Sequence, residues 1–359
     1  MKIDKDTVVL ITGGAQGLGF ATAKYLASKG AKIFIVDIDE NKLRKVYGCL
    51  FNPASRLDLS WCLCDVSIPE QVEAAINQCV TKFGKIDAVI SCAGIAAYSC
   101  TYNEALNLEL DLDICKNTMN VNYFGSLHLA KYASKAMAKN TPNERGERGV
   151  ICFTSSVCAT EGLQMSLPYS ASKAAINGMV LPMTRDLSHL GIRVNSINAG
   201  TFPTNMQING IKAGYGVNDE EGIKKFQKEF IDRYYPPETY DNLGQGQVED
   251  FGHFVASIIE NPFMNGSVLR FDGGMTSSDW AMQFLADILD AGVDRPKTLE
   301  TTAVGAAWLA GSAVGYYPPF DEFSRLWNSE SHFTPKMQED ERESKYSAWK
   351  SAVKATIGA

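Results

Sequence analysis

The chain has 359 residues, a formal net charge of −7, 45% hydrophobic residues and 21% charged residues. This length suits one large domain with an appendage or two domains, and the composition is ordinary for a globular protein. The acidic balance argues against non-specific nucleic-acid binding. No apolar run approaches the 18 residues of a membrane span, so we expect neither nucleic acid nor membrane as a partner.

Cysteine usage and the N-terminal residues bear on the compartment. All nine cysteines lie between Cys49 and Cys158, and the spacing of Cys62 and Cys64 is not that of a zinc knuckle. We therefore expect buried reduced thiols rather than disulfides or a metal site. Residues 1–6 carry charges of both signs, which is typical of neither a secretory signal nor a transit peptide. We expect a cytoplasmic protein, with a mitochondrial one as the alternative.

The first predicted elements form a cofactor site. Residues 8–11 are an uninterrupted apolar run, as in a strand buried on both faces of a parallel sheet. A glycine-rich turn follows at residues 12–19, and residues 20–28 predict an amphipathic helix. Glycines at 13, 17 and 19 permit a tight turn and a close approach of a pyrophosphate to backbone N–H groups at the helix N-terminus.

The second predicted strand, residues 32–36, ends at Asp37. A carboxylate at this position accepts hydrogen bonds from both hydroxyls of an adenosine ribose and repels a 2′-phosphate. We therefore expect NAD rather than NADP as the cofactor.

Farther along the chain, Tyr169 and Lys173 stand four residues apart. In a helix the two side chains share a face. An unperturbed tyrosine has a pKa of about 10, and a fixed cation beside the phenolate lowers it, each pKa unit being worth roughly 1.4 kcal/mol. The pair predicts a general base that removes a proton from an alcohol, although the same spacing also occurs on solvated helices.

The Gly-x-x-x-Gly-x-Gly turn, together with Tyr169 and Lys173, resembles the short-chain dehydrogenase/reductase family over residues 5–274. The resemblance implies an α/β fold with a doubly wound parallel sheet, the Rossmann fold. It also implies a catalytic tetrad of Asn122, Ser156, Tyr169 and Lys173. In this family the serine orients the alcohol, the tyrosine takes its proton, the lysine also binds the nicotinamide ribose, and the asparagine holds a water beside the lysine.

The resemblance further implies a set of cofactor contacts along the chain, at the turn, at the strand ends and at the tetrad. Cys92 stands where the family usually has asparagine, and Ala199 where it has proline. The expected contacts are Gly13, Gln16, Gly17, Leu18, Gly19, Asp37, Asp65, Val66, Cys92, Ala93, Gly94, Tyr169, Lys173, Gly200, Phe202 and Thr204.

Longer stretches resemble one branch of the family, the multifunctional type-2 3-hydroxyacyl-CoA dehydrogenases, which also oxidise hydroxysteroids. This resemblance implies a secondary alcohol or ketone as substrate, a mobile lid over residues 205–248, and a homo-oligomer, either a tetramer or a dimer. Residues 99–116 are expected at the pocket mouth. Leu163 follows Glu161-Gly162 where the branch has glutamine, so a hydroxysteroid, a prostanoid or another secondary alcohol stays open.

A seventh strand is expected at residues 267–271, and the chain then continues with predicted helices at 280–289, 301–315 and 341–355. This tail resembles the C-terminal end of glycerol kinases, but nothing upstream resembles the kinase phosphate loops or catalytic aspartate, so phosphoryl transfer is not expected. We expect a dehydrogenase domain at 1–274 and a kinase-like, mostly helical fragment at 275–359. The tail is either a functional appendage, a fusion remnant or a sequence artefact. The competing function is a non-catalytic binding or scaffolding module.

Overall fold

The computed structural model describes residues 1–50, 58–104, 108–202, 204–206, 209, 221–222, 246–272, 293–296, 329–334 and 336. The chain divides into two compact units, Met1–Lys228 with Gln245–Asp272 and Glu229–Gly244 with Gly273–Ala359. The helices expected at 280–289, 301–315 and 341–355 lie outside the described residues, as does most of the expected lid. In the second unit the description covers the antiparallel strands β10 (Val293–Pro296) and β11 (Ser329–Phe333).

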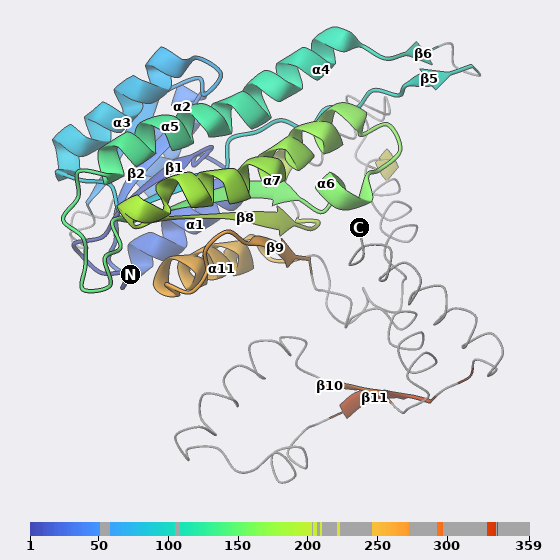
Figure 1. The fold of residues 1–359 in the computed structure, drawn as a ribbon. Coiled ribbons are helices and arrows are strands. Elements are labelled where there is room, and N and C mark those ends of the chain that lie inside the picture. The colour runs from blue at the N-terminus through green and yellow to red at the C-terminus, as the bar shows by residue number, and fades with distance from the viewer. Residues whose placement is uncertain are drawn as a thin grey trace. The chain divides into compact units, whose positions relative to one another are not determined.

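The first unit contains a seven-stranded sheet in the order β3-β2-β1-β4-β7-β8-β9 (Figure 1). All neighbouring strands pair in parallel, and the order reverses direction between β1 and β4. This arrangement confirms the doubly wound sheet. The strands are β1 (Val8–Thr12), β2 (Lys32–Asp37), β3 (Leu59–Leu63), β4 (Ala88–Ser91), β7 (Gly149–Ser156), β8 (Ile192–Ala199) and β9 (Val268–Phe271).

Helices cover both faces of the sheet, which is why its central strands are apolar throughout. Successive residues of β1 alternate between two hydrophobic clusters, Val9 and Ile11 in one and Val8 and Leu10 in the other. The first cluster contains residues of α1 (Gly17–Ser28), α2 (Glu40–Leu50) and α11 (Val248–Glu260). The second contains residues of α3 (Pro69–Phe83), α5 (Gly125–Met137) and α7 (Leu167–Leu187).

The remaining described elements are short and lie around the site. A π-helical turn, η1 (Met119–Phe124), joins α4 (Leu112–Thr118) to α5. The helix α6 (Cys158–Glu161) follows β7, and the 3₁₀ turn η2 (Ser188–Leu190) follows α7. The strands β5 (Tyr102–Asn103) and β6 (Leu108–Glu109) form a small antiparallel ribbon.

A buried arginine fastens α11 and the segment after it to the sheet. The Arg193 guanidinium, 5% exposed, lies 2.6 Å from the Glu147 carboxylate. It also donates to the carbonyls of Ile258 (2.9 Å), Ile259 (2.9 Å) and Met264 (2.7 Å). Because the strand β9 follows directly and pairs with β8, residues 248–272 belong to the first unit.

We predict that Arg193→Met destabilises the first unit by about 3–5 kcal/mol, because it leaves the buried Glu147 carboxylate without its main partner and three carbonyls without a donor. Urea denaturation measures the effect. Arg44→Gln, which breaks the exposed Glu40–Arg44 pair on α2, is the control and costs less than about 1 kcal/mol. Equal effects of the two variants would contradict the assignment.

Candidate active site

The predicted catalytic residues meet beyond the carboxyl ends of the central strands, where the strand order reverses. Ser156 is the last residue of β7, and Tyr169 and Lys173 lie on the first turns of α7. Asn122 lies in η1, and π-helical turns of this kind occur frequently at functional sites. Four residues from three separate parts of the chain are thereby brought to one edge of the sheet.

Tyr169 and Lys173 share a face of α7, as their spacing predicts. The Lys173 ammonium nitrogen lies 5.6 Å from the centre of the Tyr169 ring and donates to the Thr154 carbonyl at 2.7 Å. Lys173 is only 4% exposed. The carbonyl at the end of β7 therefore fixes the lysine side chain against the tyrosine.

Asn122 is fully buried and its amide is occupied by neighbouring backbone and side-chain groups. Its Oδ1 accepts from the Ile95 N–H (2.8 Å), and its Nδ2 donates to the Ile95 carbonyl (3.0 Å) and to Ser172 Oγ (2.9 Å). These contacts attach η1 to the segment after β4 and to α7. The expected water between Asn122 and Lys173 stays a prediction.

Ser156 is fixed by the backbone and lies near Tyr169. Its Oγ accepts a hydrogen bond from the Cys158 backbone N–H at 3.2 Å, and its hydroxyl is close enough to Tyr169 to lower the pKa of that phenol. An oxygen that accepts from the backbone keeps its own O–H to donate. Ser156 and Tyr169 can thus both address one substrate oxygen.

The protonation of the pair differs from the sequence-based expectation. Burial raises the pKa of Tyr169, and the nearby Cys158 and Tyr98 raise it further. Ser156 acts in the opposite direction but does not offset these effects. Burial also lowers the pKa of Lys173 to about 8, against smaller opposing effects of Cys92 and Cys158. The expected lowering of the Tyr169 pKa by Lys173 is therefore not seen in the protein alone, where burial is the largest effect on the Tyr169 pKa.

Glycines without side chains connect this pair to the cofactor turn. A Cβ on Gly94 would lie 3.7 Å from Lys173 Nζ and 3.1 Å from Asn122 Oδ1. A Cβ on Gly13, where φ is +65°, would lie 2.6 Å from the Ala93 nitrogen, and one on Gly19 would overlap the Gly13 carbonyl. The glycine turn therefore packs against the end of β4, and the end of β4 lies next to the lysine.

The turn has the features of a dinucleotide cradle. The helix α1 begins at Gly17 after Gln16, and among the described residues no acidic side chain lies in its first turn and no side chain caps it. Its first N–H groups are therefore open to a negatively charged ligand. Asp37 at the end of β2 accepts from the Ala15 N–H (3.1 Å) and the Asp39 N–H (3.2 Å), and each oxygen retains a lone pair for a ribose hydroxyl. The residues present fit a dinucleotide.

Several further expected contacts lie near this cradle. Thr204 is next to Gly17, whose Cβ would lie 3.4 Å from the threonine methyl group. Ala93 donates to Thr12 Oγ1 at 3.3 Å, and the Cys92 thiol lies 3.3 Å from Thr154 Oγ1. Cys92, which stands where the family usually has asparagine, therefore contacts a threonine of β7.

Other residues expected to contact the cofactor already make hydrogen bonds or core contacts within the protein. Asp65 Oδ1 accepts from the N–H and hydroxyl of Ser67 (2.9 and 2.7 Å), next to the buried Val66. Gly200 donates its N–H to the Phe271 carbonyl at 2.9 Å. Phe202 is buried in the first cluster, with ring centres 6.1 Å from Phe251 and 6.0 Å from Phe271. Only the backbone of Phe202 is thus available to a cofactor.

A cleft of about 370 Å³ has Ser170, the residue after Tyr169, in its lining, whereas the four tetrad residues themselves do not line it. One part of the lining, Ser99–Tyr102, falls within the segment expected at the pocket mouth. The other part includes Leu163, which the sequence analysis compares with a glutamine of the branch, but the rest of that part was not predicted. Its signal was its place in the chain between Ser156 and Tyr169. The cleft is lined by Ser99, Cys100, Thr101, Tyr102, Gly162, Leu163, Gln164, Met165, Leu167 and Ser170.

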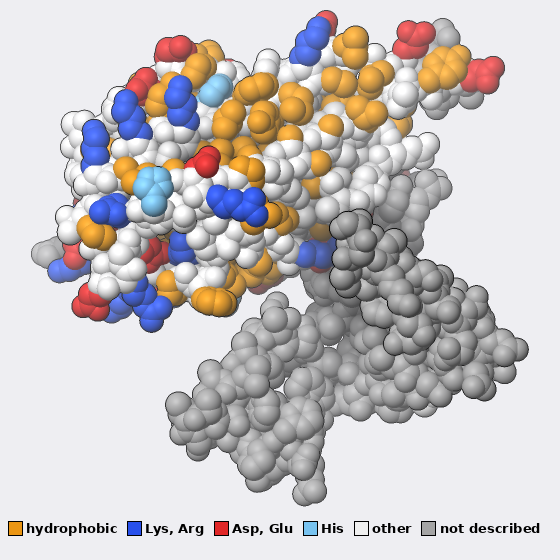
Figure 2. Space-filling view, in the orientation of Figure 1, with side chains coloured by type: hydrophobic (Ala, Val, Ile, Leu, Met, Phe, Trp, Pro, Cys, Tyr) orange, Lys and Arg blue, Asp and Glu red, His pale blue; other side chains and the backbone are white. Residues whose placement is uncertain are grey.

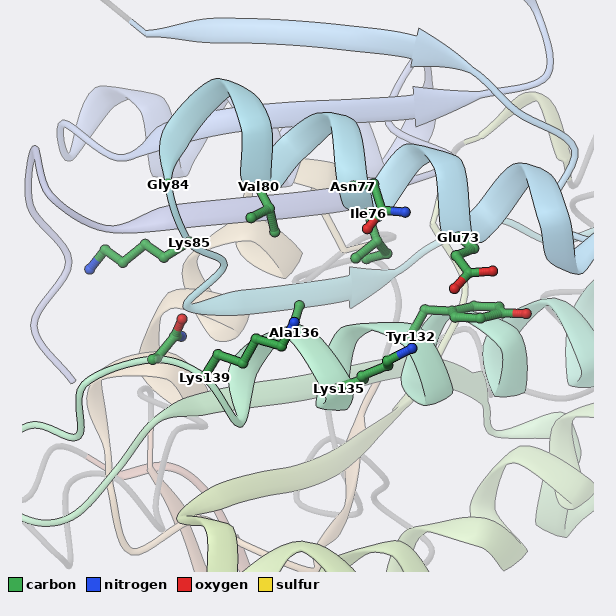
Figure 3. A pocket seen from close by; sticks show the side chains of 11 residues that line it. Glu73, Ile76, Asn77, Val80, Gly84, Lys85, Tyr132, Lys135, Ala136 and Lys139 are labelled. Carbon is green, nitrogen blue, oxygen red and sulfur yellow. The ribbon is translucent and has the colours of Figure 1, made fainter.

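A second hollow, of about 330 Å³, lies between α3 and α5 (Figure 3). It includes Gly84 and Lys85, which precede β4, so it lies toward the amino end of that strand, away from the catalytic residues. None of the predicted site residues lines it. It therefore belongs to a different part of the surface.

Comparison with known proteins identifies the family. The family model for short chain dehydrogenases matches residues 7–213. The chain belongs to this family. The 3-hydroxyacyl-CoA dehydrogenase type-2 of Rattus norvegicus is 36% identical over 276 residues, which are 76% of this chain and 95% of the relative. The ipsdienol dehydrogenase of Ips pini is 30% identical over 275 residues, which are 76% of this chain and 97% of the relative.

Solved structures agree with this assignment. A levodione reductase structure is 27% identical with a TM-score of 0.65, and the match covers 77% of this chain and 99% of that one. An NAD⁺-bound xylitol dehydrogenase structure is 25% identical with a TM-score of 0.65, covering 76% and 100%. The prediction of an oxidoreductase of this family, acting on CH–OH groups, is confirmed.

The resemblance of the tail to kinases is also confirmed. The model for the C-terminal domain of the FGGY family of carbohydrate kinases matches residues 246–314. A glycerol kinase of Roseobacter denitrificans is 59% identical over 91 residues, which are 25% of this chain and 18% of the kinase. The kinase model thus overlaps α11 and β9, which the structure places in the dehydrogenase unit.

Proposed function

We propose that the chain is an NAD-dependent dehydrogenase that oxidises a secondary alcohol to a ketone. The observation that carries this proposal is a series of close approaches, from Gly13 to Ala93, from Gly94 to Lys173, and from Lys173 to Tyr169. These approaches support a site in which the groups proposed to transfer the proton lie beside the dinucleotide cradle. The position of Asp37 supports NAD over NADP, because its carboxylate repels a 2′-phosphate.

In this proposal Ser156 donates a hydrogen bond to the alcohol oxygen and stabilises its developing negative charge. Tyr169 accepts the proton from the same oxygen. Bound NAD⁺ supplies the acceptor for the hydride of the carbinol carbon. Lys173, fixed on Thr154, contributes its charge to the crevice and faces the expected position of the nicotinamide ribose, while Asn122 holds the segment after β4 in place.

For the substrate we propose a 3-hydroxyacyl-CoA or a hydroxysteroid. The match between this chain and type-2 3-hydroxyacyl-CoA dehydrogenases extends over nearly the whole length of those enzymes. Leu163, Met165 and Leu167 give one cleft wall an apolar character that also suits a steroid skeleton. NADH formation with a panel of 3-hydroxyacyl-CoAs and hydroxysteroids separates the two. No turnover with any alcohol would favour the non-catalytic alternative.

We propose a domain boundary near residue 274, supported by the division of the two units after Asp272. A cytoplasmic location, with the mitochondrion as the alternative, stays a prediction. It is supported by the eight described cysteines, all of which are free thiols, as expected in a reducing compartment. Within the described part of the chain no helix has the length and apolarity needed to span a bilayer.

We predict that Tyr169→Phe lowers kcat for alcohol oxidation by about 10²–10⁴-fold, because the proton acceptor is lost. NAD binding, measured by calorimetry, stays within about twofold of the wild-type value, since the ring remains. Tyr132→Phe, on α5 in the second hollow, is the matched control and keeps full activity. Wild-type turnover in the Tyr169 variant would refute the assignment.

The pH dependence follows from the same two groups. Burial raises the pKa of Tyr169, so the fraction of phenolate increases with pH through the neutral range, while Lys173 keeps its charge below its pKa of about 8. We predict that kcat/KM for alcohol oxidation rises from pH 6 to 8 and that ketone reduction, which needs the neutral phenol, does not. Initial rates in both directions measure this. A flat oxidation profile would contradict it.

We also propose a homo-oligomer, a tetramer or a dimer. Figure 2 shows hydrophobic side chains gathered over this face of the first unit. Leu112 on α4 (62%), Phe124 in η1 (41%) and Leu181 on α7 (52%) are exposed. Light scattering should give two or four times the chain mass, and Phe124→Lys should lower it. Leu63→Lys, at a somewhat more exposed site on β3, is the control. A monomeric wild-type protein would contradict this proposal.

A further inference from the structure

The segment between Ser156 and Tyr169 forms one wall of the cleft, and it has little regular structure of its own. The helix α6 is four residues long, and Gly162, which follows it, has φ +53°. Met165, three residues later, has φ +65°, a conformation that costs energy for a residue with a side chain. Such a segment depends on outside contacts to keep its shape.

One anchor lies at the far end of the segment. The Ser99 N–H donates to the Met165 carbonyl at 2.7 Å, and Ser99 forms a parallel bridge with Ser166. The Ser166 hydroxyl accepts from the Leu163 N–H (2.9 Å) and lies 2.8 Å from Ser170 Oγ. These contacts fix the segment where it enters α7.

The other anchor comes from the edge of the sheet. The Arg270 guanidinium, on β9, forms an ion pair with Glu161, the last residue of α6. It also binds Asp272 through Nε at 2.7 Å and through a second nitrogen at 2.5 Å. The Asp272 side chain is only 3% exposed, so the arginine is already oriented when it meets Glu161. This pre-orientation distinguishes the contact from an ordinary exposed pair, which contributes little.

Arg270 stands opposite Asn198 in the register of β8 and β9, near the carboxyl end of the sheet. It also falls inside the residues matched by the carbohydrate kinase model. Its partner Glu161 belongs to the part matched by the dehydrogenase model. The ion pair therefore joins a residue of the segment shared with kinases to the wall of the dehydrogenase cleft.

We propose that Arg270 is a positioning residue for the dehydrogenase reaction, holding Glu161 so that Gly162 and Leu163 keep the cleft wall in place for the alcohol. This inference rests on the function proposed above. Without the pair, Gly162 is free to rotate, and the wall moves relative to Ser156 and Tyr169. We expect this movement to affect the alcohol subsite, whereas the glycine turn at residues 13–19, which makes no contact with the pair of Arg270 and Glu161, keeps its position.

The test compares Arg270→Gln, Glu161→Gln and the double variant with the wild-type chain. Each single variant should raise KM for the alcohol about fivefold or more and leave KM for NAD within twofold. Glu161→Gln, which keeps the contact of Arg270 with the buried Asp272, should also leave the unfolding midpoint unchanged. In KM for the alcohol, the double variant should be no worse than Arg270→Gln alone, because that variant already removes the contact with Glu161. Lys29→Gln is the matched control: it breaks the similarly exposed Lys29–Glu260 pair between α1 and α11 and should change none of these values.

Hydrogen–deuterium exchange of residues 158–167 provides a readout that does not need turnover. Exchange should become faster in both single variants and stay unchanged in Lys29→Gln. Unchanged exchange, a wild-type KM for the alcohol, or additive effects in the double variant would overturn the inference. If the wild-type chain turns over no alcohol, the proposed function fails, and the exchange experiment still decides whether Arg270 holds the segment.

Discussion

The close approach of β1 and β4 at their carboxyl ends is the constraint on which the site depends. The backbone of Gly13 lies against Ala93, and Gly94 leaves room for both Asn122 and Lys173. A side chain at either glycine would push the glycine turn away from the lysine. Because no side chain intervenes, a cofactor on the turn and a base on α7 can share one crevice.

Around this contact, the fold uses backbone groups to place the reactive side chains. Lys173 is held by a carbonyl of β7, Ser156 by an N–H of α6, and Asn122 by both backbone groups of Ile95. Backbone positions are set by the sheet and its packing, so the site inherits the rigidity of the core. The cost is burial, which raises the pKa of Tyr169 and lowers that of Lys173.

Local patterns predicted much of this from the sequence. Three features can be recognised from residues that are neighbours in the sequence. They are the apolar runs of the central strands, the glycine turn, and Asp37 at the end of β2. The raised pKa of Tyr169 was not foreseen, because it depends chiefly on burial, which the spacing of Tyr169 and Lys173 does not reveal. The side chain of Phe202 was also not foreseen in the core, since its partners Phe251 and Phe271 are distant in sequence. The pairing of Arg270 with Glu161 was not foreseen for the same reason.

The C-terminal segment shows how one stretch of sequence satisfies two family patterns, because an apolar helix and an edge strand ending in Asp272 suit either sheet. Here β9 completes the dehydrogenase sheet, and α11 packs against it.

The most direct test of the whole account uses a secondary alcohol deuterated at its carbinol carbon. Mass spectrometry of the reduced NAD should find one deuterium transferred from the alcohol. Reduced NAD without deuterium, or its absence with every alcohol in the panel, would contradict the account.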